Sequence, residues 1–216
     1  MKGLTPLQTE VLQRFFARRD EFFLTGGAAL VGFYTGHRET HDLDLFTAGQ
    51  PLDEGERTLR EVASALDLSF ESIRREPAFR RFLVRQREGG ESLVIDLVRD
   101  DAPQLREKRI VGNVRVDSAE EILANKFCAL LSRVEVRDLV DVMVLQQSGL
   151  DPIAAVHAAA GKDAGVTPSQ LAWVLSSFPI PEDRGLPGEV SPDTLRAFRD
   201  DLIRRLAAAA FPEPAP

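Results

Sequence analysis

The sequence has little of what disulfide-bonded, zinc-binding and membrane proteins depend on. A single cysteine, Cys128, excludes an internal disulfide and a cysteine-based metal site. Its apolar setting, KFCALL, favours a buried core residue over a nucleophile. Three histidines are too few and too scattered for a zinc site. No apolar run approaches the ~20 residues that cross a bilayer, and the N-terminal residues lack the apolar core of a secretory signal. We therefore expect a cytoplasmic protein without a membrane segment.

The chain is also short of positive charge. Its net charge of −7 argues against a surface built for non-specific nucleic-acid binding, although a local basic patch remains compatible with it. With 44% apolar and 28% charged residues, the composition is that of an ordinary globular protein. The 216 residues suffice for one large domain, or for a domain with a helical extension.

The pattern along the chain changes from mixed to helical near residue 118. Thr5-Pro6 marks the start of an N-terminal helix, because threonine caps helices well and proline fits the first turn. The same logic marks helix starts at Asp151-Pro152, Thr167-Pro168 and Ser191-Pro192. Strands are expected at 22–25, 42–46, 68–75, 78–86, 92–98 and 109–116, and further helices at 28–36 and 51–67.

These signals predict an α+β fold in two parts. Residues 1–117 are expected to form a domain with a short mixed β-sheet flanked by helices. Residues 118–216 are expected to form an all-helical domain. No internal repeat is visible in the sequence.

Two aspartates interrupt the apolar strand DLDLF. Side chains alternate between the faces of a strand, so Asp42 and Asp44 point the same way, while the leucines between and after them point the other way. Two neighbouring carboxylates repel each other and are costly to desolvate. A divalent cation between them relieves both costs, and Mg²⁺ prefers a few carboxylates completed by phosphate oxygens. The pair therefore indicates a metal site.

A third acid, Asp96, lies at the centre of the apolar strand SLVIDLV. If this strand pairs beside DLDLF, Asp96 completes a three-carboxylate cluster able to hold two metal ions. Such a cluster supports in-line attack on a phosphoryl group. The alternative is structural: the acids would sit at strand ends, satisfied by backbone N–H groups or by arginine.

Gly26-Gly27 stands between a strand and a helix. Glycine lets the backbone approach a ligand closely, and a helix N-terminus offers unpaired N–H groups to phosphate. Taken alone, the pair fits a tight turn equally well. The glycine pair, then fourteen residues, then DLDL, and then a lone aspartate in a later apolar strand together make a strong signal.

These motifs resemble those of the nucleotidyltransferase (polymerase β-like) superfamily. More closely, the chain looks like the AbiEii/AbiGii-type toxins of bacterial toxin–antitoxin and phage-defence systems. The resemblance rests on LTGGAAL, GHRETHDLDLF, LVIDLVRDD and EILANKFCALLSRVEVRDLVDVMVL, which run in order from residue 24 to 145.

The resemblance implies Mg²⁺-dependent transfer of a nucleotidyl group from an NTP to an acceptor hydroxyl. Family members act on the acceptor end of transfer RNA, and a cognate antitoxin restrains them. Asp42 and Asp44 would hold Mg²⁺ on the triphosphate, and Asp96 would share in metal binding and help to activate the acceptor. The nucleotide-binding residues implied are Gly26, Gly27, Thr40, Lys126, Arg137 and Asp138.

The basic residues named above and one arginine-rich segment also allow a purely structural interpretation. Lys126 could extend from an apolar helix face to solvent instead of neutralising phosphate. Arg137 could form a helix-surface pair with Asp141. The six arginines of residues 74–87 could contact an RNA backbone, or could protect a solvated sheet edge from unwanted pairing.

Two other functions also fit the sequence. The acceptor could be a small molecule, as in aminoglycoside nucleotidyltransferases. The chain could instead be a binding protein that retains the fold and acts through a partner without catalysis.

Overall fold

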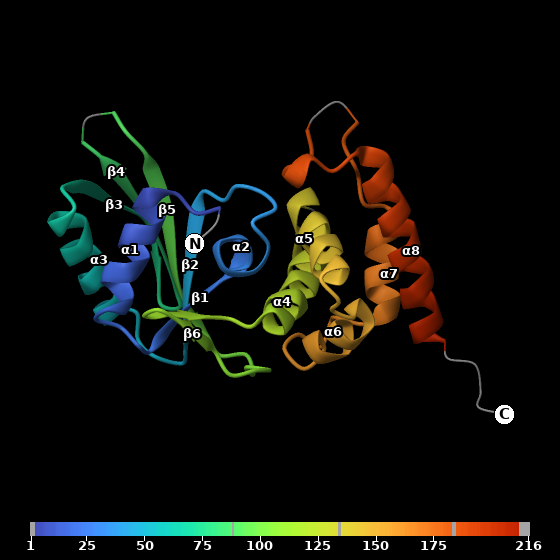
Figure 1. Ribbon diagram of the computed structural model, residues 1–216. Coiled ribbons are helices and arrows are strands. Elements are labelled where there is room, and N and C mark those ends of the chain that lie inside the picture. Colours follow the sequence, from blue (N-terminus) through green and yellow to red (C-terminus); the bar gives the residue numbers. More distant parts are fainter. Residues whose placement is uncertain (1–2, 88, 134, 183–184, 212–216) are drawn as a thin grey trace. The chain divides into compact units, whose positions relative to one another are not determined.

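A computed structural model (Figure 1) describes residues 3–87, 89–133, 135–182 and 185–211. The chain divides into two compact units, residues 1–118 and 119–216. Each unit has its own architecture and is described by itself.

The first unit is built on a mixed sheet, in which the described residues form seven strands. The order across the sheet is β3-β4-β5-β2-β1-β7-β6. β2 runs parallel to β5 and antiparallel to β1, so both β2 and β5 have a neighbour on each side. The strands are β1 Phe22–Thr25, β2 Asp42–Ala48, β3 Leu68–Glu76, β4 Phe79–Gln86, β5 Ser92–Asp100, β6 Arg109–Val111 and β7 Val114–Val116.

Helices α1 (Pro6–Phe16) and α3 (Asp53–Ala65) cover one face of this sheet (Figure 1). Leu43 and Leu45 of β2 point to this face and are fully buried. The packing is tight, because a methyl group added at Gly55 of α3 would lie 2.6 Å from the Phe22 ring. The apolar residues that alternate along these strands therefore form the core beneath the helices. The residues between them point to the opposite face of the sheet.

A buried ion pair joins α3 to the covered face. Nη1 of Arg80 lies 2.6 Å from Oε2 of Glu56, and both side chains are buried. Burial alone would raise the pKa of Glu56, but a hydrogen bond from Arg60 and the charges of Arg75 and Arg80 outweigh it. The pKa of Glu56 therefore lies below its usual value, and this carboxylate is ionised at neutral pH.

A short helical segment follows β1 directly. It consists of α2 (Gly26–Leu30) and a π-helical turn, η1 (Val31–Thr35), and it ends at Gly36 in the left-handed conformation. The predicted helix end at Gly36 is thus confirmed. The stretch 109–116, predicted as one strand, is instead the β6–β7 hairpin. Gly112 has a φ of 64°, a conformation open to glycine at little cost, and it turns the chain there.

Helices make up the second unit. The predicted helix starts are confirmed, because Asp151, Thr167 and Ser191 each accept a backbone hydrogen bond at an N-cap. Throughout the described residues, no helix is both long enough and apolar enough to span a bilayer. The elements are α4 Ala119–Ser132, α5 Val136–Gln147, α6 Pro152–Ala159, α7 Pro168–Ser176, the 3₁₀ turn η2 Pro187–Glu189 and α8 Pro192–Ala210.

Candidate active site

The three predicted acids of the first unit lie on the sheet face opposite α1 and α3. Asp42 and Asp44 alternate with the buried leucines of β2, so their side chains leave the covered face. Asp44 is paired in register with Asp96 of β5. Residues paired in register project from the same face of a sheet, so the carboxyl groups of Asp44 and Asp96 are direct neighbours. The predicted pairing of the two acidic strands is confirmed.

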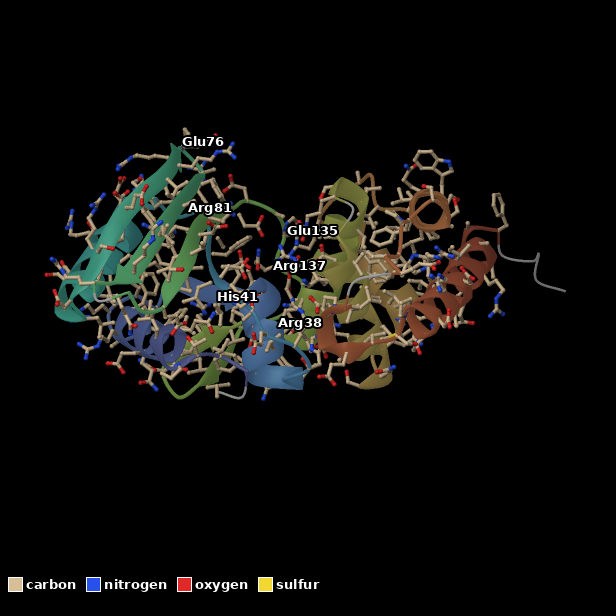
Figure 2. All side chains as sticks on the ribbon, turned by 90° about the horizontal axis from the view of Figure 1, so that it is seen from above. Arg38, His41, Glu76, Arg81, Glu135 and Arg137 are labelled. Carbon is tan, nitrogen blue, oxygen red and sulfur yellow. The ribbon has the colours of Figure 1, made fainter. Side chains whose placement is uncertain are left out.

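The register extends this row across five strands. Thr25, Asp44, Asp96, Arg81 and Arg74 follow one another on β1, β2, β5, β4 and β3. Two acids are thus followed by two arginines on a single line across the sheet. Arg81 projects from β4 on this face (Figure 2).

Arg81 engages both carboxylate oxygens of Asp96. Its Nε lies 2.8 Å from Oδ1, and its Nη2 lies 2.6 Å from Oδ2, which is a bidentate fork. The hydrogen bond to Asp96 raises the pKa of Arg81; burial opposes this, and the charges of Asp96, Asp42 and Asp44 add to it. All three carboxylates therefore stabilise the positive charge of Arg81. The sequence offered arginine only as a general partner for these acids, and period-two alternation alone did not single out Arg81.

Gly26 packs against Asp44, and Gly27 packs against Thr40 and Arg38. Gly26 has a φ of 65°, and a methyl group added there would lie 2.1 Å from Oδ2 of Asp44. At Gly27 an added methyl group would lie 3.2 Å from Oγ1 of Thr40 and 2.9 Å from Nη2 of Arg38. Bare backbone thus comes close to side chains that a larger residue would displace.

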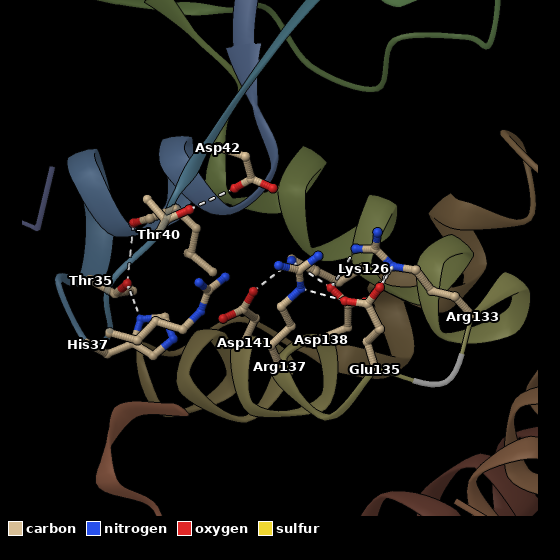
Figure 3. Close-up of polar contacts among 12 residues, drawn as sticks. Thr35, His37, Thr40, Asp42, Lys126, Arg133, Glu135, Arg137, Asp138 and Asp141 are labelled. Carbon is tan, nitrogen blue, oxygen red and sulfur yellow. Dashed lines mark hydrogen bonds and ion pairs between the residues drawn. The ribbon is translucent and has the colours of Figure 1, made fainter. Parts of the chain in front are cut away.

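Thr40 connects the glycines to the first aspartate. Its Oγ1 lies 3.0 Å from Oδ1 of Asp42 and donates a hydrogen bond to that carboxylate (Figure 3). The structure therefore gathers six of the predicted site residues in the first unit. They are Gly26, Gly27, Thr40, Asp42, Asp44 and Asp96.

Gly26→Ala tests the close approach to Asp44. The added methyl group would push the Asp44 carboxylate from its place, and a positive φ costs a non-glycine residue about 1–3 kcal/mol. We expect this variant to lose most nucleotide binding, measured by calorimetric titration, and to unfold at lower denaturant concentration. Gly112→Ala is the matched control, since it has a similar φ and nothing within 4 Å of the added methyl group. If both variants bound nucleotide equally well, contact with Asp44 would not be what requires glycine at position 26.

The donor chemistry of the site fits Mg²⁺ through two carboxylates completed by substrate phosphate. This is the usual protein contribution to a magnesium site. In the part of the chain that the structure describes, no three His, Cys, Asp or Glu side chains are grouped so that they could hold a metal ion by themselves. The site differs here from a ready three-carboxylate cage, because the oxygens of Asp96 already accept hydrogen bonds from Arg81.

The other predicted residues belong to the second unit, where Lys126 lies between two carboxylates. Its Nζ is 2.8 Å from Oδ1 of Asp138 and 2.6 Å from Oδ2 of Asp141, and both acids are fully buried (Figure 3). Burial would raise the pKa of Asp138, but the charge of Lys126 and hydrogen bonds from Arg133 and Lys126 hold it below its usual value. The structure thus places Lys126 in a buried cluster of ion pairs, not at the solvent edge of an apolar helix face.

Arg137 lies on the same helix as Asp138 but is more open. Its Nε pairs with Oε2 of Glu135 at 2.5 Å, and both side chains are partly exposed. Its side chain is therefore far more accessible to a ligand than that of Lys126.

The six arginines of residues 74–87 all have acidic partners. One carboxylate on α3, one just after it and three on the strands neutralise them, so the segment presents charge that is already paired. The ion pairs are Arg74–Glu76, Arg75–Glu56, Arg80–Glu56, Arg81–Asp96, Arg85–Glu71 and Arg87–Asp67. This pairing weakens the interpretation of the segment as an RNA-binding strip.

Comparison with known families places these features in context. Residues 10–214 match the family model described as "Nucleotidyl transferase AbiEii toxin, Type IV TA system". The chain belongs to the AbiEii family. It is therefore a member of a family of nucleotidyltransferase toxins of type IV toxin–antitoxin systems, as the sequence motifs predicted.

Solved structures agree on the fold. JHP933 from Helicobacter pylori is similar with a TM-score of 0.61 at 17% identity, and the match covers 94% of this chain and 91% of that one. MenT4, a nucleotidyltransferase toxin from Mycobacterium tuberculosis, has a TM-score of 0.51 at 15% identity, covering 97% and 83% of the two chains. At such identities the likeness concerns the fold alone, and it confirms the predicted α+β class. No curated protein matches this AbiEii chain.

Proposed function

We propose that this AbiEii protein transfers a nucleotidyl group from an NTP to a hydroxyl at the acceptor end of transfer RNA, with Mg²⁺ as cofactor. The observation that carries the proposal is the joint placement of Asp42, Asp44 and Asp96 on one sheet face, with Gly26 packed against Asp44. Carboxylates can bind the metal ion, and a glycine backbone without side chains next to them leaves room for the triphosphate.

The residues of the first unit take separate roles. Asp42 and Asp44 hold the cation that neutralises the triphosphate, and Thr40 keeps the Asp42 carboxylate oriented through its hydrogen bond. The backbone at Gly26 and Gly27 faces the phosphates. Bound Mg²⁺ supplies charge neutralisation at the phosphoryl oxygens.

Asp96 acts on the acceptor. The acceptor oxygen forms a bond to the α-phosphorus, and the bond from that phosphorus to pyrophosphate breaks. The hydroxyl proton passes to Asp96, whose side chain lies beside the Asp44 carboxylate on the same face. Asp96 also contributes to metal binding once nucleotide is present.

We further propose a division of labour along the chain. Residues 1–117 form the catalytic domain and residues 118–216 the helical domain, from which Lys126, Arg137 and Asp138 serve nucleotide binding. Arg137 is partly exposed and can meet phosphate directly, whereas Lys126 and Asp138 form a buried pair and act by fixing the helix that carries Arg137. A cognate antitoxin is the expected protein partner of a type IV toxin.

The transfer is tested with each of the four NTPs, radiolabelled at the α-phosphate, together with Mg²⁺ and total RNA. We expect one nucleotide to label RNA of transfer-RNA length, and EDTA to abolish the labelling. Release of pyrophosphate without labelled RNA would overturn the RNA acceptor in favour of a small molecule. Consumption of none of the four nucleotides would overturn the transfer itself.

A further inference from the structure

The proposed function assigns metal binding to Asp96, but in the structure both carboxylate oxygens of Asp96 accept hydrogen bonds from Arg81. Asp96 is on a central strand, with Asp44 on one side in register and Arg81 on the other. Its side chain is 7% exposed, so its charge is poorly screened by water. Like charges in register repel, and each needs a partner when it is out of water. Arg81 supplies that partner.

Arg81 is more open than Arg80 and Lys126, two other basic groups that pair with buried acids. Its side chain is 46% exposed, whereas those of Arg80 and Lys126 are 8% and 7% exposed within their own pairs. While it is bound to Asp96, its guanidinium also lies 5.6 Å from the centre of the Phe79 ring, a contact that it makes outside the ion pair. Arg81 can therefore leave Asp96 without being trapped in the core.

A second cation biases Arg81 toward the acids. Arg74 stands opposite Arg81 in the register, and its own guanidinium is bound by Glu76 at 2.6 Å. Two arginines opposite each other repel, so the position of Arg81 over Asp96 is favoured while the acid has no other cation nearby. A divalent ion at the acids would reverse this preference, because it would repel Arg81 as well.

We propose that Arg81 is an internal counter-ion that keeps the acid site closed to free divalent cations, so that metal enters only together with nucleotide. This inference rests on the proposed function. Arg81 occupies both oxygens of Asp96 and brings one positive charge to three carboxylates, so a metal ion arriving alone must displace it. A metal–triphosphate complex brings phosphate oxygens that complete the metal's ligands and give the released guanidinium an anionic partner.

The test is the binding of Mn²⁺ alone, followed by electron paramagnetic resonance without any nucleotide. The wild-type protein should bind Mn²⁺ weakly, and Arg81→Gln should bind it at least ~10-fold more tightly, a change of about 1.4 kcal/mol. Arg85→Gln is the matched control, because Arg85 is on the same strand and face, with a looser 3.9 Å contact to Glu71. It should bind Mn²⁺ like the wild type.

A second variant covers the case in which Arg81→Gln fails to fold. Arg81→Lys keeps the charge but replaces the two-point fork with one contact, so it should bind Mn²⁺ about 3-fold more tightly than the wild type. Unchanged Mn²⁺ affinity in a folded Arg81→Gln, or in Arg81→Lys where the glutamine variant does not fold, would overturn the counter-ion role. Nucleotidyl transfer by the wild type is measured separately, so this failure is distinct from failure of the proposed function.

Discussion

Asp44→Asn should lower nucleotidyl transfer by about 10³-fold, the scale of losing one electrostatic group aimed at a reacting phosphate. Asparagine has nearly the same shape, so it still fits against Gly26, but it removes the charge that a metal–triphosphate needs. The measurement is the initial rate of labelling of transfer RNA at saturating nucleotide. Calorimetric titration should show weaker binding of the same nucleotide with Mg²⁺.

The control for this prediction is Asp101→Asn. Asp101 is an exposed acid just beyond β5, so losing its charge should leave the labelling rate unchanged. The same variants decide between catalysis and a purely binding toxin when they are overexpressed. Equal growth arrest by the wild type and Asp44→Asn, although the variant has lost its labelling activity, would favour a protein that acts through its partner.

Lys126→Met should reduce the free energy of unfolding by about 3–5 kcal/mol, the usual cost of removing one side of a buried ionic cluster. The carboxylates of Asp138 and Asp141 are fully buried, and both lose the lysine. Arg133 still reaches Asp138, which keeps the expected cost from rising further. Urea unfolding followed by circular dichroism measures the change, with nucleotide left out so that only folding is reported.

Arg137→Met tests the contrast between the partly exposed Arg137 and the buried Lys126 of the same unit. Its pair with Glu135 is partly exposed, so the variant should lose only about 0–1 kcal/mol of stability. Nucleotide binding should nevertheless weaken if Arg137 meets phosphate as proposed.

The outcome that would contradict the Lys126→Met prediction is a loss of stability of less than about 1 kcal/mol. It would mean that water or local movement stabilises the two buried acids in place of the lysine.

The acids could be identified from sequence because alternation along a strand is a strict rule. DLDLF places its two aspartates on one side whatever the strand's neighbours are, and a lone acid in an apolar strand stands out. The glycine pair gained its meaning from its spacing to those acids. The structure adds that a methyl group at Gly26 would lie 2.1 Å from Oδ2 of Asp44, which is why we expect no side chain to be tolerated there.

Arg81 was beyond the reach of the same reasoning. Arg80 and Arg81 are neighbours on β4 and point to opposite faces, one toward Glu56 and one toward Asp96. Alternation shows that they separate, but only the pairing register of β4 with β5 decides which of them meets the acids. That register depends on the turn between the strands, and the local sequence pattern does not fix it.

The cluster around Lys126 shows a related limit. Asp138 and Asp141 are three residues apart, so the sequence places them on one side of a helix. Whether that side faces water or another helix depends on packing between α4 and α5, which lies outside any single helical pattern. In the structure it faces inward, and the lysine from α4 meets both acids.

The position of the acidic strands within the sheet has a consequence for motion. β2 and β5 are hydrogen-bonded on both sides, whereas β3 and β6 form the two margins of the sheet. Edge strands open first when a sheet fluctuates. Strands that are hydrogen-bonded to a neighbour on each side open only when most of the domain unfolds. The amides around residues 44 and 96 should thus be among the slowest of this unit to exchange with deuterium, and the spacing of those carboxyl groups should survive fraying that loosens the rest.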